Sequence, residues 1–174
     1  MGMDVYGKKP LTETGEYFRN NVWWWRPLWQ YCVEQHPDII DPKTAEAGHY
    51  NSGAGLTAGK AKALGKALLE DISNGVTDKW RDDYYAVIAT LPMIPCEWCD
   101  TTGIRTDDVG VSSGMHTREL DSDTATLLGR SHGWCNACNG EGHREPWEAS
   151  YPFEVKNVRE FAEFLLNCGG FEIC

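Results

Sequence analysis

The segments CEWCDTTG, residues 96–103, and CNACNGEG, residues 135–142, decide how the central part of this 174-residue chain folds. Each segment holds two cysteines separated by two residues, and this spacing lets both sulfurs turn toward one metal ion. Two such pairs supply the four thiolates of a tetrahedral zinc shell, so we predict one structural Zn²⁺. The predicted ligands are Cys96, Cys99, Cys135 and Cys138. A shell filled by four protein ligands leaves no position for a catalytic water, so this motif predicts a structural role for the metal ahead of a catalytic one.

Glycines follow both cysteine pairs: Gly103 after the first, and Gly140 and Gly142 after the second. Glycine adopts the positive-φ turns that fold backbone around a metal and aim amide groups at the sulfurs. The pattern resembles the zinc repeats of J-domain cochaperones, C-x-x-C-x-G-x-G, which the second segment matches in full. The first segment departs from it, because Thr101 stands where the first glycine belongs. The resemblance covers only these two segments and implies a metal-binding hairpin, not a chaperone.

Four further side chains lie close to the cysteine pairs. We expect Trp98 and Trp134, inside the first pair and beside the second, to pack around the metal hairpin, which is too small to have a core of its own. His132 and His143 flank the second pair. Because four thiolates with matched spacing are available, we expect both histidines to lie outside the metal shell.

The remaining composition is that of an acidic globular protein, with 41% hydrophobic residues and a formal net charge of −10. Zinc held by four thiolates would lower the net charge by two more. Sequence-independent binding to nucleic acid depends on Lys and Arg, so we expect no nucleic-acid partner. The charge is compatible with a basic protein partner or with mimicry of nucleic acid, while acidic solubility explains it without any partner.

Nothing in the sequence predicts export or a membrane span. The opening MGMDVYGKKP has no apolar run, and no 18 consecutive apolar residues occur anywhere. Seven cysteines with metal-type spacing favour a reducing cytoplasm. We expect Cys32 and Cys168, at apolar helix positions, to be buried, and the terminal Cys174 to be exposed.

The hydrophobic pattern predicts an α+β fold with a small sheet, about four helices and a protruding zinc hairpin lobe with four cysteine ligands. The α+β core is expected to comprise residues 1–95 and 145–174, and the zinc-binding lobe residues 96–144. Between the cysteine pairs the chain is rich in Asp, Ser, Thr and Gly and shows no clear period. We predict that about 104–131 form a mobile acidic insertion.

Apolar stripes and stop signals place the elements of the core. The predicted helices cover residues 27–36, 57–74, 78–90 and 157–168. In the last of these, Asn157 and Glu160 have the spacing of a capping box. Short strands are predicted at 3–7 and 171–174 and can pair, with their register open, whereas 41–56 are predicted to form a loop.

An aromatic block is the first candidate binding site in the core. It consists of Trp23, Trp24, Trp25 and Trp29, with Arg19 and Arg26 beside them. Three consecutive tryptophans cannot all point the same way on a helix or strand, so at least one should approach the surface. Exposed Trp beside Arg is typical of protein-binding hot spots and of pockets that stack a planar ligand. The alternative interpretation is that the rings pack in the core and cover the arginine stems.

Two other segments suggest binding. GHYNSGAGLTAGKA, residues 48–61, lacks the spacing of a phosphate-binding P-loop, but His49, Tyr50 and Asn51 are candidates to line a small-molecule pocket. A flexible loop is the alternative. The tripeptide His36-Pro37-Asp38 is the one with which J domains stimulate an ATPase. In that family the preceding helix is strongly basic, whereas PLWQYCVEQ contains no Lys or Arg, and Pro37 can simply end a helix.

The chain as a whole is similar to a set of small proteins of bacteria, phages and prophages. The similarity is carried by the opening MGMDVYGKKP, the block GEYFRNNVWWWRPL, the central Cys-x-x-Cys pair and the ending YPFEVKNVREFAEFLLNCGGFEIC. That set has no established activity, so the resemblance implies an origin and no mechanism.

The preferred hypothesis is a non-enzymatic, zinc-stabilised binding protein of phage or prophage type, an accessory or anti-defence protein acting on a host macromolecule, with a host protein favoured. The aromatic block, or the acidic insertion at 107–123, would provide the contact surface. No catalytic motif stands out in the sequence. One alternative is a protein that binds or processes a small planar, nucleotide-like ligand through the aromatic block and the His49 loop. Another is a J-type cochaperone acting through His36-Pro37-Asp38.

Overall fold

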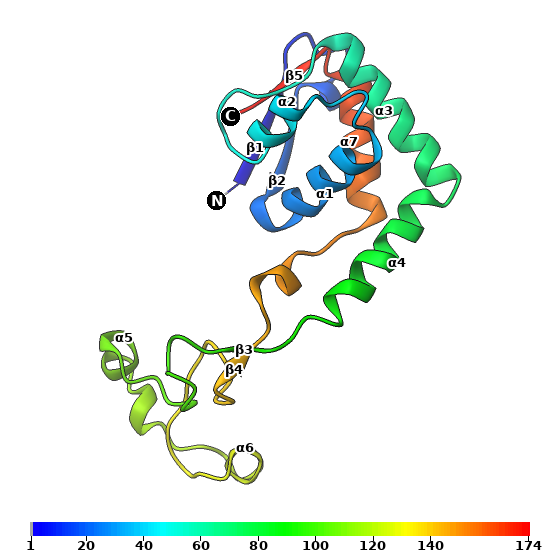
Figure 1. Ribbon diagram of the computed structural model, residues 1–174. Helices are drawn as coiled ribbons and strands as arrows, with labels where there is room; N and C mark the ends of the chain where they lie inside the picture. Colours follow the sequence, from blue (N-terminus) through cyan, green and yellow to red (C-terminus); the bar gives the residue numbers. More distant parts are fainter. Residues whose placement is uncertain (1) are drawn as a thin grey trace. The chain divides into compact units, whose positions relative to one another are not determined.

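The computed structural model describes residues 2–174 and divides the chain into two compact units. Met1–Ala89 and Ser150–Cys174 form the first, here called the core unit, and Thr90–Ala149 form the second, here called the cysteine unit. Seven α-helices and small antiparallel sheets lie within the described residues, so the predicted α+β class is confirmed (Figure 1). None of the described helices is long and apolar enough to cross a membrane.

The core unit contains one three-stranded antiparallel sheet in the order β2-β1-β5. Its strands are β1 (Gly2–Gly7), β2 (Tyr17–Asn21) and β5 (Phe171–Ile173), and a short 3₁₀ helix, η1 (Glu13–Gly15), precedes β2. Strand β1 is central: Val5 lies opposite Phe18 on one side and Ile173 on the other. The predicted pairing of the two ends of the chain is therefore confirmed, and its register is fixed by the burial of Val5 and Ile173.

Five helices complete the core unit. They are α1 (Val22–Gln35), α2 (Pro42–Ala47), α3 (Ala58–Ser73), α4 (Val76–Ile88) and α7 (Val155–Asn167). Helix α7 lies between α1 and α3 (Figure 1). Gly65 permits the close approach of α3 to α7, because a β-carbon there would lie 2.9 Å from the Ala162 carbonyl oxygen. The rings of Trp25, Trp29 and Phe161 pack at centroid distances of 5.5 Å in the centre of this unit.

Two helix starts differ from the prediction. Helix α1 begins five residues before Pro27, at Val22, because the Asn21 side chain accepts hydrogen bonds from the Trp23 and Trp24 amides at 3.0 and 3.1 Å. The unpredicted helix α2 begins after Asp41, which caps the Thr44 amide at 3.0 Å. The prediction of a loop throughout 41–56 was therefore wrong. Asp-Pro before a short helix is a recognised start signal, but six residues show too little periodicity to reveal the helix.

The capping box predicted at Asn157 and Glu160 is also wrong. Helix α7 begins at Val155, after Glu154, so Asn157 lies within its first turn. The Asn157 side chain instead accepts a hydrogen bond from Asn20 at 2.8 Å and donates one to the Trp24 carbonyl at 3.4 Å. The Asn157 side chain therefore makes tertiary hydrogen bonds to β2 and α1, whereas the local pattern predicted that it caps the helix.

The cysteine unit has little regular structure. It contains the strands β3 (Ile94–Pro95) and β4 (His143–Arg144), which pair antiparallel, and the short helices α5 (Asp108–Ser112) and α6 (Ser122–Leu128). The 3₁₀ helix η2 (Met115–Thr117) lies between these helices, and a further 3₁₀ helix, η3 (Trp147–Ser150), follows β4. Both α-helices lie in the predicted insertion at 104–131, where five- and seven-residue helices are too short to give a readable period. They bring the total above the four helices expected.

The histidine of the His36-Pro37-Asp38 tripeptide belongs to a cluster of polar side chains in the core unit. His36 Nε2 lies 2.9 Å from the Asp71 carboxylate, which also accepts a hydrogen bond from the Tyr31 hydroxyl at 2.8 Å. The Tyr31 hydroxyl lies 2.9 Å from Thr77, and both of these side chains are buried. Asp71 therefore joins the end of α1 to α3, so His36 has a structural role within the core unit.

Replacing Asp71 with alanine should destabilise the core unit. The Tyr31 hydroxyl and the His36 ring would lose a shared acceptor in a half-buried place, which costs about 1–3 kcal/mol. Urea unfolding followed by tryptophan fluorescence measures the change. The matched control is Asp83→Ala, which removes only an exposed α4 ion pair with Lys79 and should change the unfolding free energy by less than about 0.5 kcal/mol. Equal effects of both variants would contradict the role given to Asp71.

Candidate metal centre

The four cysteines of the two segments converge on one point. Cys96 Sγ lies 3.9 Å from Cys135 Sγ, and Cys99 Sγ lies 3.7 Å from Cys138 Sγ. All four sulfurs lie within 4.8 Å of one another, and all four residues are buried. The chain thus brings together residues 96–99 and 135–138 in a geometry that can hold a metal ion.

The sulfur spacing is compatible with a metal shell and too long for disulfides. Sulfurs bonded at about 2.3 Å to a tetrahedral zinc are separated by about 3.8 Å, whereas a disulfide holds them at about 2.05 Å. The observed 3.7 and 3.9 Å match the first distance. Without a metal, burial raises the pKa of the Cys99 thiol to about 12. Burial acts in the same direction on Cys138, but the Gly142 amide at 3.2 Å and neighbouring thiols outweigh it and lower the pKa of Cys138.

The two segments follow the same backbone path after their second cysteine. In each, the first, second and fourth residues after that cysteine have positive φ. The angles are +47° at Asp100, +65° at Thr101 and +72° at Gly103, and +50° at Asn139, +80° at Gly140 and +81° at Gly142. The amide of the second residue donates to the carbonyl of the first cysteine in both copies, at 3.3 Å to Cys96 and 3.1 Å to Cys135. The segments are therefore two copies of one cysteine-containing turn.

Thr101 adopts the conformation that the motif normally gives to glycine. Its φ of +65° belongs to the left-handed region, where a β-branched side chain is strained. The departure of the first segment from the C-x-x-C-x-G-x-G pattern therefore changes the residue but not the turn.

Each turn packs against the backbone of the other. A β-carbon on Gly103 would overlap the carbonyl oxygen of Gly140, and one on Gly142 would overlap that of Thr101. The Cys96 amide donates to the Gly142 carbonyl at 2.9 Å. Gly103 and Gly142 are thus required by close approach between the turns as well as by their own φ angles.

The repeat extends beyond the cysteines and glycines to a pair of arginines. Arg105 and Arg144 each stand nine positions after the first cysteine of their own segment. Arg105 donates to the Asn136 side chain at 3.0 Å, and Arg144 pairs with the Glu97 carboxylate at 3.1 Å. Each arginine thus contacts the residue that follows the first cysteine of the other copy.

The sequence analysis missed these arginines, although the signal was present as an identical offset in both segments. A third arginine, Arg130, donates to the carbonyl oxygens of Gly103 and Gly140 at 3.0 and 2.6 Å. Four thiolates around a divalent ion carry a net charge of −2, which cations beside the shell offset.

The side chains expected around the shell differ in their placement. Trp134 is half-buried, and the Arg118 guanidinium carbon lies 5.1 Å from its ring centroid. Trp98 is 43% exposed, and the Arg105 guanidinium carbon lies 4.9 Å from its ring centroid. Trp98 therefore covers the hairpin on one side only. His132 and His143 are exposed and do not belong to the group of metal-ligating side chains.

The aromatic block is divided between core and surface. Trp25 and Trp29 are fully buried, and their indole N–H groups donate to the carbonyls of Gly48 and Ala45 at 2.8 and 2.9 Å. Trp23 is 38% exposed and Trp24 is half-buried. The core interpretation therefore holds for two of the rings, since a buried and internally bonded indole cannot stack a ligand.

The polar residues of the candidate site point to different places. The Arg26 guanidinium carbon lies 5.6 Å from the centroid of the Tyr151 ring, and the Trp23 ring centroid lies 5.1 Å from the same ring. Arg19 is elsewhere, with its Nε 3.7 Å from the Asp4 carboxylate on the sheet. The side chain of Asn51 donates to the Gly2 carbonyl at 3.0 Å and so ties its loop to β1.

His49 lines a groove between α1 and α2 that includes no tryptophan of the block. The structure therefore does not bring the aromatic block, His49 and Asn51 into one site.

Comparison with known proteins adds no relative: no family model matches the chain, and neither the curated proteins nor the solved structures contain a match.

Replacing Cys138 with serine should release the metal and unfold the cysteine unit. An incomplete shell loses most of a binding free energy that reaches about 10 kcal/mol or more in structural sites. Metal analysis and hydrogen exchange measure the two effects, with loss of protection expected in residues 90–149 and retention in the core unit. Cys32→Ser and Cys174→Ser are the matched controls outside the cluster. Full metal content in Cys138→Ser would contradict the ligand assignment.

Thr101→Gly should strengthen metal binding, because it removes left-handed strain of about 1 kcal/mol from the first turn. Competition with a chelator should show roughly fivefold tighter binding. The matched control is Thr106→Gly, at a neighbouring exposed position without positive φ. Added backbone freedom there should lower the metal affinity or leave it unchanged. An equal gain from both variants would show that strain at Thr101 is not the cause.

Proposed function

We propose that this protein is a non-enzymatic binding protein whose cysteine unit is stabilised by one zinc ion, and that it acts on a host protein as an accessory or anti-defence protein of phage or prophage type. The observation that carries the proposal is the group of four buried sulfurs within 4.8 Å. A shell completed by four protein ligands has no open position for substrate or water, so it supports a structural use of the metal.

Zinc is the metal that the ligand set favours. Soft thiolates in a tetrahedral arrangement select zinc or iron over calcium and magnesium, which take oxygen ligands. Two of the sulfur–sulfur distances, 3.7 and 3.9 Å, match the edge of about 3.8 Å expected for one tetrahedral centre with bonds of about 2.3 Å, and all four sulfurs lie within 4.8 Å of one another.

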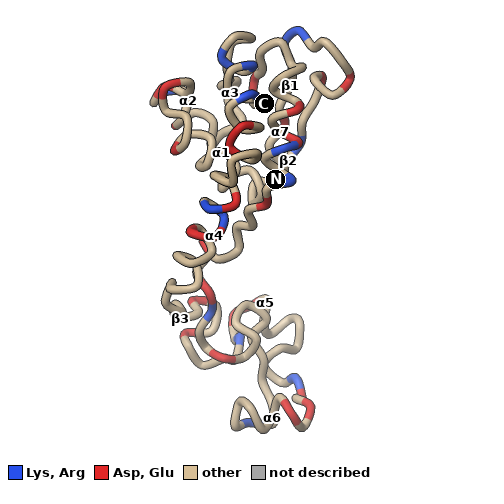
Figure 2. Tube along the Cα trace, turned by 90° about the vertical axis from the view of Figure 1, so that its right-hand side faces the viewer, with Lys and Arg blue, Asp and Glu red and all other residues tan. Residues whose placement is uncertain are grey.

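The charge of the cysteine unit supports a basic protein as partner. Residues 90–149 contain ten Asp and Glu, four Arg and no Lys, and Figure 2 colours the positions of these residues along the Cα trace. Bound zinc would add the −2 charge of the tetrathiolate centre to this excess. A surface with this charge repels phosphate backbones and attracts Lys and Arg.

The two alternative functions receive less support. The rings that would stack a planar ligand are divided, with Trp25 and Trp29 buried and Trp23 on the surface beside Tyr151. In the His36-Pro37-Asp38 segment, His36 contacts Asp71 within the core unit. The tripeptide therefore has a structural use that does not involve another protein.

Native mass spectrometry of the protein purified from a bacterial host tests the proposal. We expect one zinc per chain together with a co-purifying protein, which denaturing conditions then release as separate masses. The Cys138→Ser variant, purified in parallel, should lose the metal. A wild-type preparation without zinc, or one that carries zinc but never a protein above background, would contradict the proposal, and a small-molecule mass would favour the ligand alternative.

A further inference from the structure

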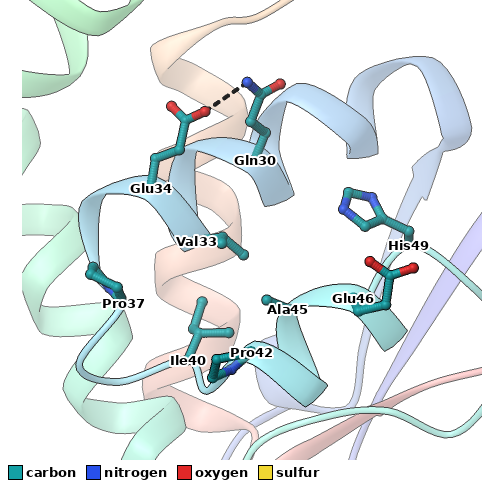
Figure 3. Close-up of a pocket in the computed structure, with 9 residues that line it drawn as sticks. All are labelled: Gln30, Val33, Glu34, Pro37, Ile40, Pro42, Ala45, Glu46 and His49. Atoms are coloured by element: carbon teal, nitrogen blue, oxygen red, sulfur yellow. Dashed lines mark hydrogen bonds between the residues drawn. The ribbon is translucent and has the colours of Figure 1, made fainter.

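A groove between α1 and α2 of the core unit has an apolar floor and an acidic rim (Figure 3). Its volume is about 610 Å³, within the range of ligand sites. Val33 and Ile40 line it from α1 and the turn after it, and Pro42 and Ala45 from α2. Figure 3 shows these side chains directed into the space between the two helices.

The rim of the groove carries negative charge only. Glu34 and Glu46 belong to the lining, which contains no Lys or Arg. The Glu34 carboxylate is turned toward Gln30, on the side of α1 away from α2 (Figure 3), and accepts hydrogen bonds from Gln30 at 2.8 Å and from the Trp80 indole at 2.9 Å. The Glu46 carboxylate has no hydrogen bond or ion pair with any side chain in residues 2–174, so it is available to a cation from outside.

The groups at the end of the groove do not cancel this charge. Burial lowers the pKa of His49, against the opposing effect of Glu46, and Arg26 lowers it further, so the ring is neutral at pH 7. Arg26 is not part of the lining, and its guanidinium lies over the Tyr151 ring at 5.6 Å.

We propose that the groove binds an arginine or lysine side chain of a protein partner, presented beside an apolar side chain. Val33, Ile40 and Ala45 would receive the methylene stem and the apolar neighbour, while Glu46 pairs with the charged end. Six of the nine lining residues are exposed, so the groove is an open seam that suits a side chain of a macromolecule better than an enclosed ligand. The inference rests on the proposed function for the existence of a protein partner and adds the site and its chemistry.

An NMR titration of the ¹⁵N-labelled, zinc-loaded full chain tests the groove. The probe is the peptide acetyl-Leu-Arg-Leu-Arg-Leu-amide, and its matched control replaces both arginines with citrulline, which keeps the shape and removes the charge. We expect shifts at the amides of Val33, Ile40 and Ala45, at least about fivefold weaker binding of the citrulline peptide, and weakening with added salt. Absence of binding at low-millimolar peptide, equal binding of both peptides, or shifts confined to other residues would overturn the proposal.

Variants separate the charge from the shape of the groove. Glu46→Gln should lower the affinity for the arginine peptide about threefold. Ala45→Leu, which fills the floor of the groove without changing its charge, should abolish binding. Glu163→Gln is the control, since this exposed glutamate of α7 is outside the lining. An unchanged affinity in Glu46→Gln would overturn the proposal. It would also be overturned if AMP shifted the same amide signals more strongly than the peptide. A shift of these signals on dilution of the protein alone would overturn it too, because the groove would then bind a second copy of the chain.

The two proposals can fail separately. Because the groove lies in the core unit, the Cys138→Ser variant should still bind the arginine peptide after losing its metal. Peptide binding without any co-purifying protein would contradict the proposed function alone. A co-purifying protein that remains bound in Glu46→Gln and Ala45→Leu would contradict the groove alone.

Discussion

Four cysteine sulfurs provide the interior of the cysteine unit, and its fold depends on what holds them together. Within residues 90–149, all of which the structure describes, the buried apolar cluster consists of the four cysteines with Ala137 against them. Buried thiolates without a counterion repel one another, and buried thiols make only weak hydrogen bonds. A metal ion at their centre would replace the packing energy that a larger unit obtains from aliphatic and aromatic side chains. The core unit differs, because its stacked tryptophans and phenylalanines bury a continuous apolar interior.

The duplicated turn shows how one short motif builds a closed site. Each copy supplies two sulfurs, and the glycine at its end leaves room for the backbone of the other copy. The reciprocal contacts of Arg105 with Asn136 and of Arg144 with Glu97 repeat this exchange at the level of side chains. A change at one turn therefore acts on both pairs of ligands, which couples the two halves of the shell.

Sequence patterns predict those parts of the molecule whose cause is local. The Cys-x-x-Cys spacing brings two sulfurs of one turn to one side, and the existence of helices α3 and α4 follows from apolar residues three and four apart, so both were predictable. The end of α1 and the cap at Thr57 belong to the same group. Two results that the patterns did not predict have tertiary causes. The Asn157 side chain bonds with Asn20 and Trp24 and does not cap its own helix, and the indoles of Trp25 and Trp29 donate to carbonyl groups on α2 and just after it.

The arginines of the cysteine unit decide what its surface offers to a partner. Arg105 binds Asp107 and Asn136, Arg130 binds two backbone carbonyls, and Arg144 binds Glu97, so these cations are directed into the unit. Arg118 lies over the Trp134 ring. Most of the carboxylates have no such partner within residues 90–149 and face water. The net excess of acid thus understates the negative field outside, because the arginines form contacts inside the unit. This field is compatible with the proposed basic protein partner and unfavourable for a phosphate backbone.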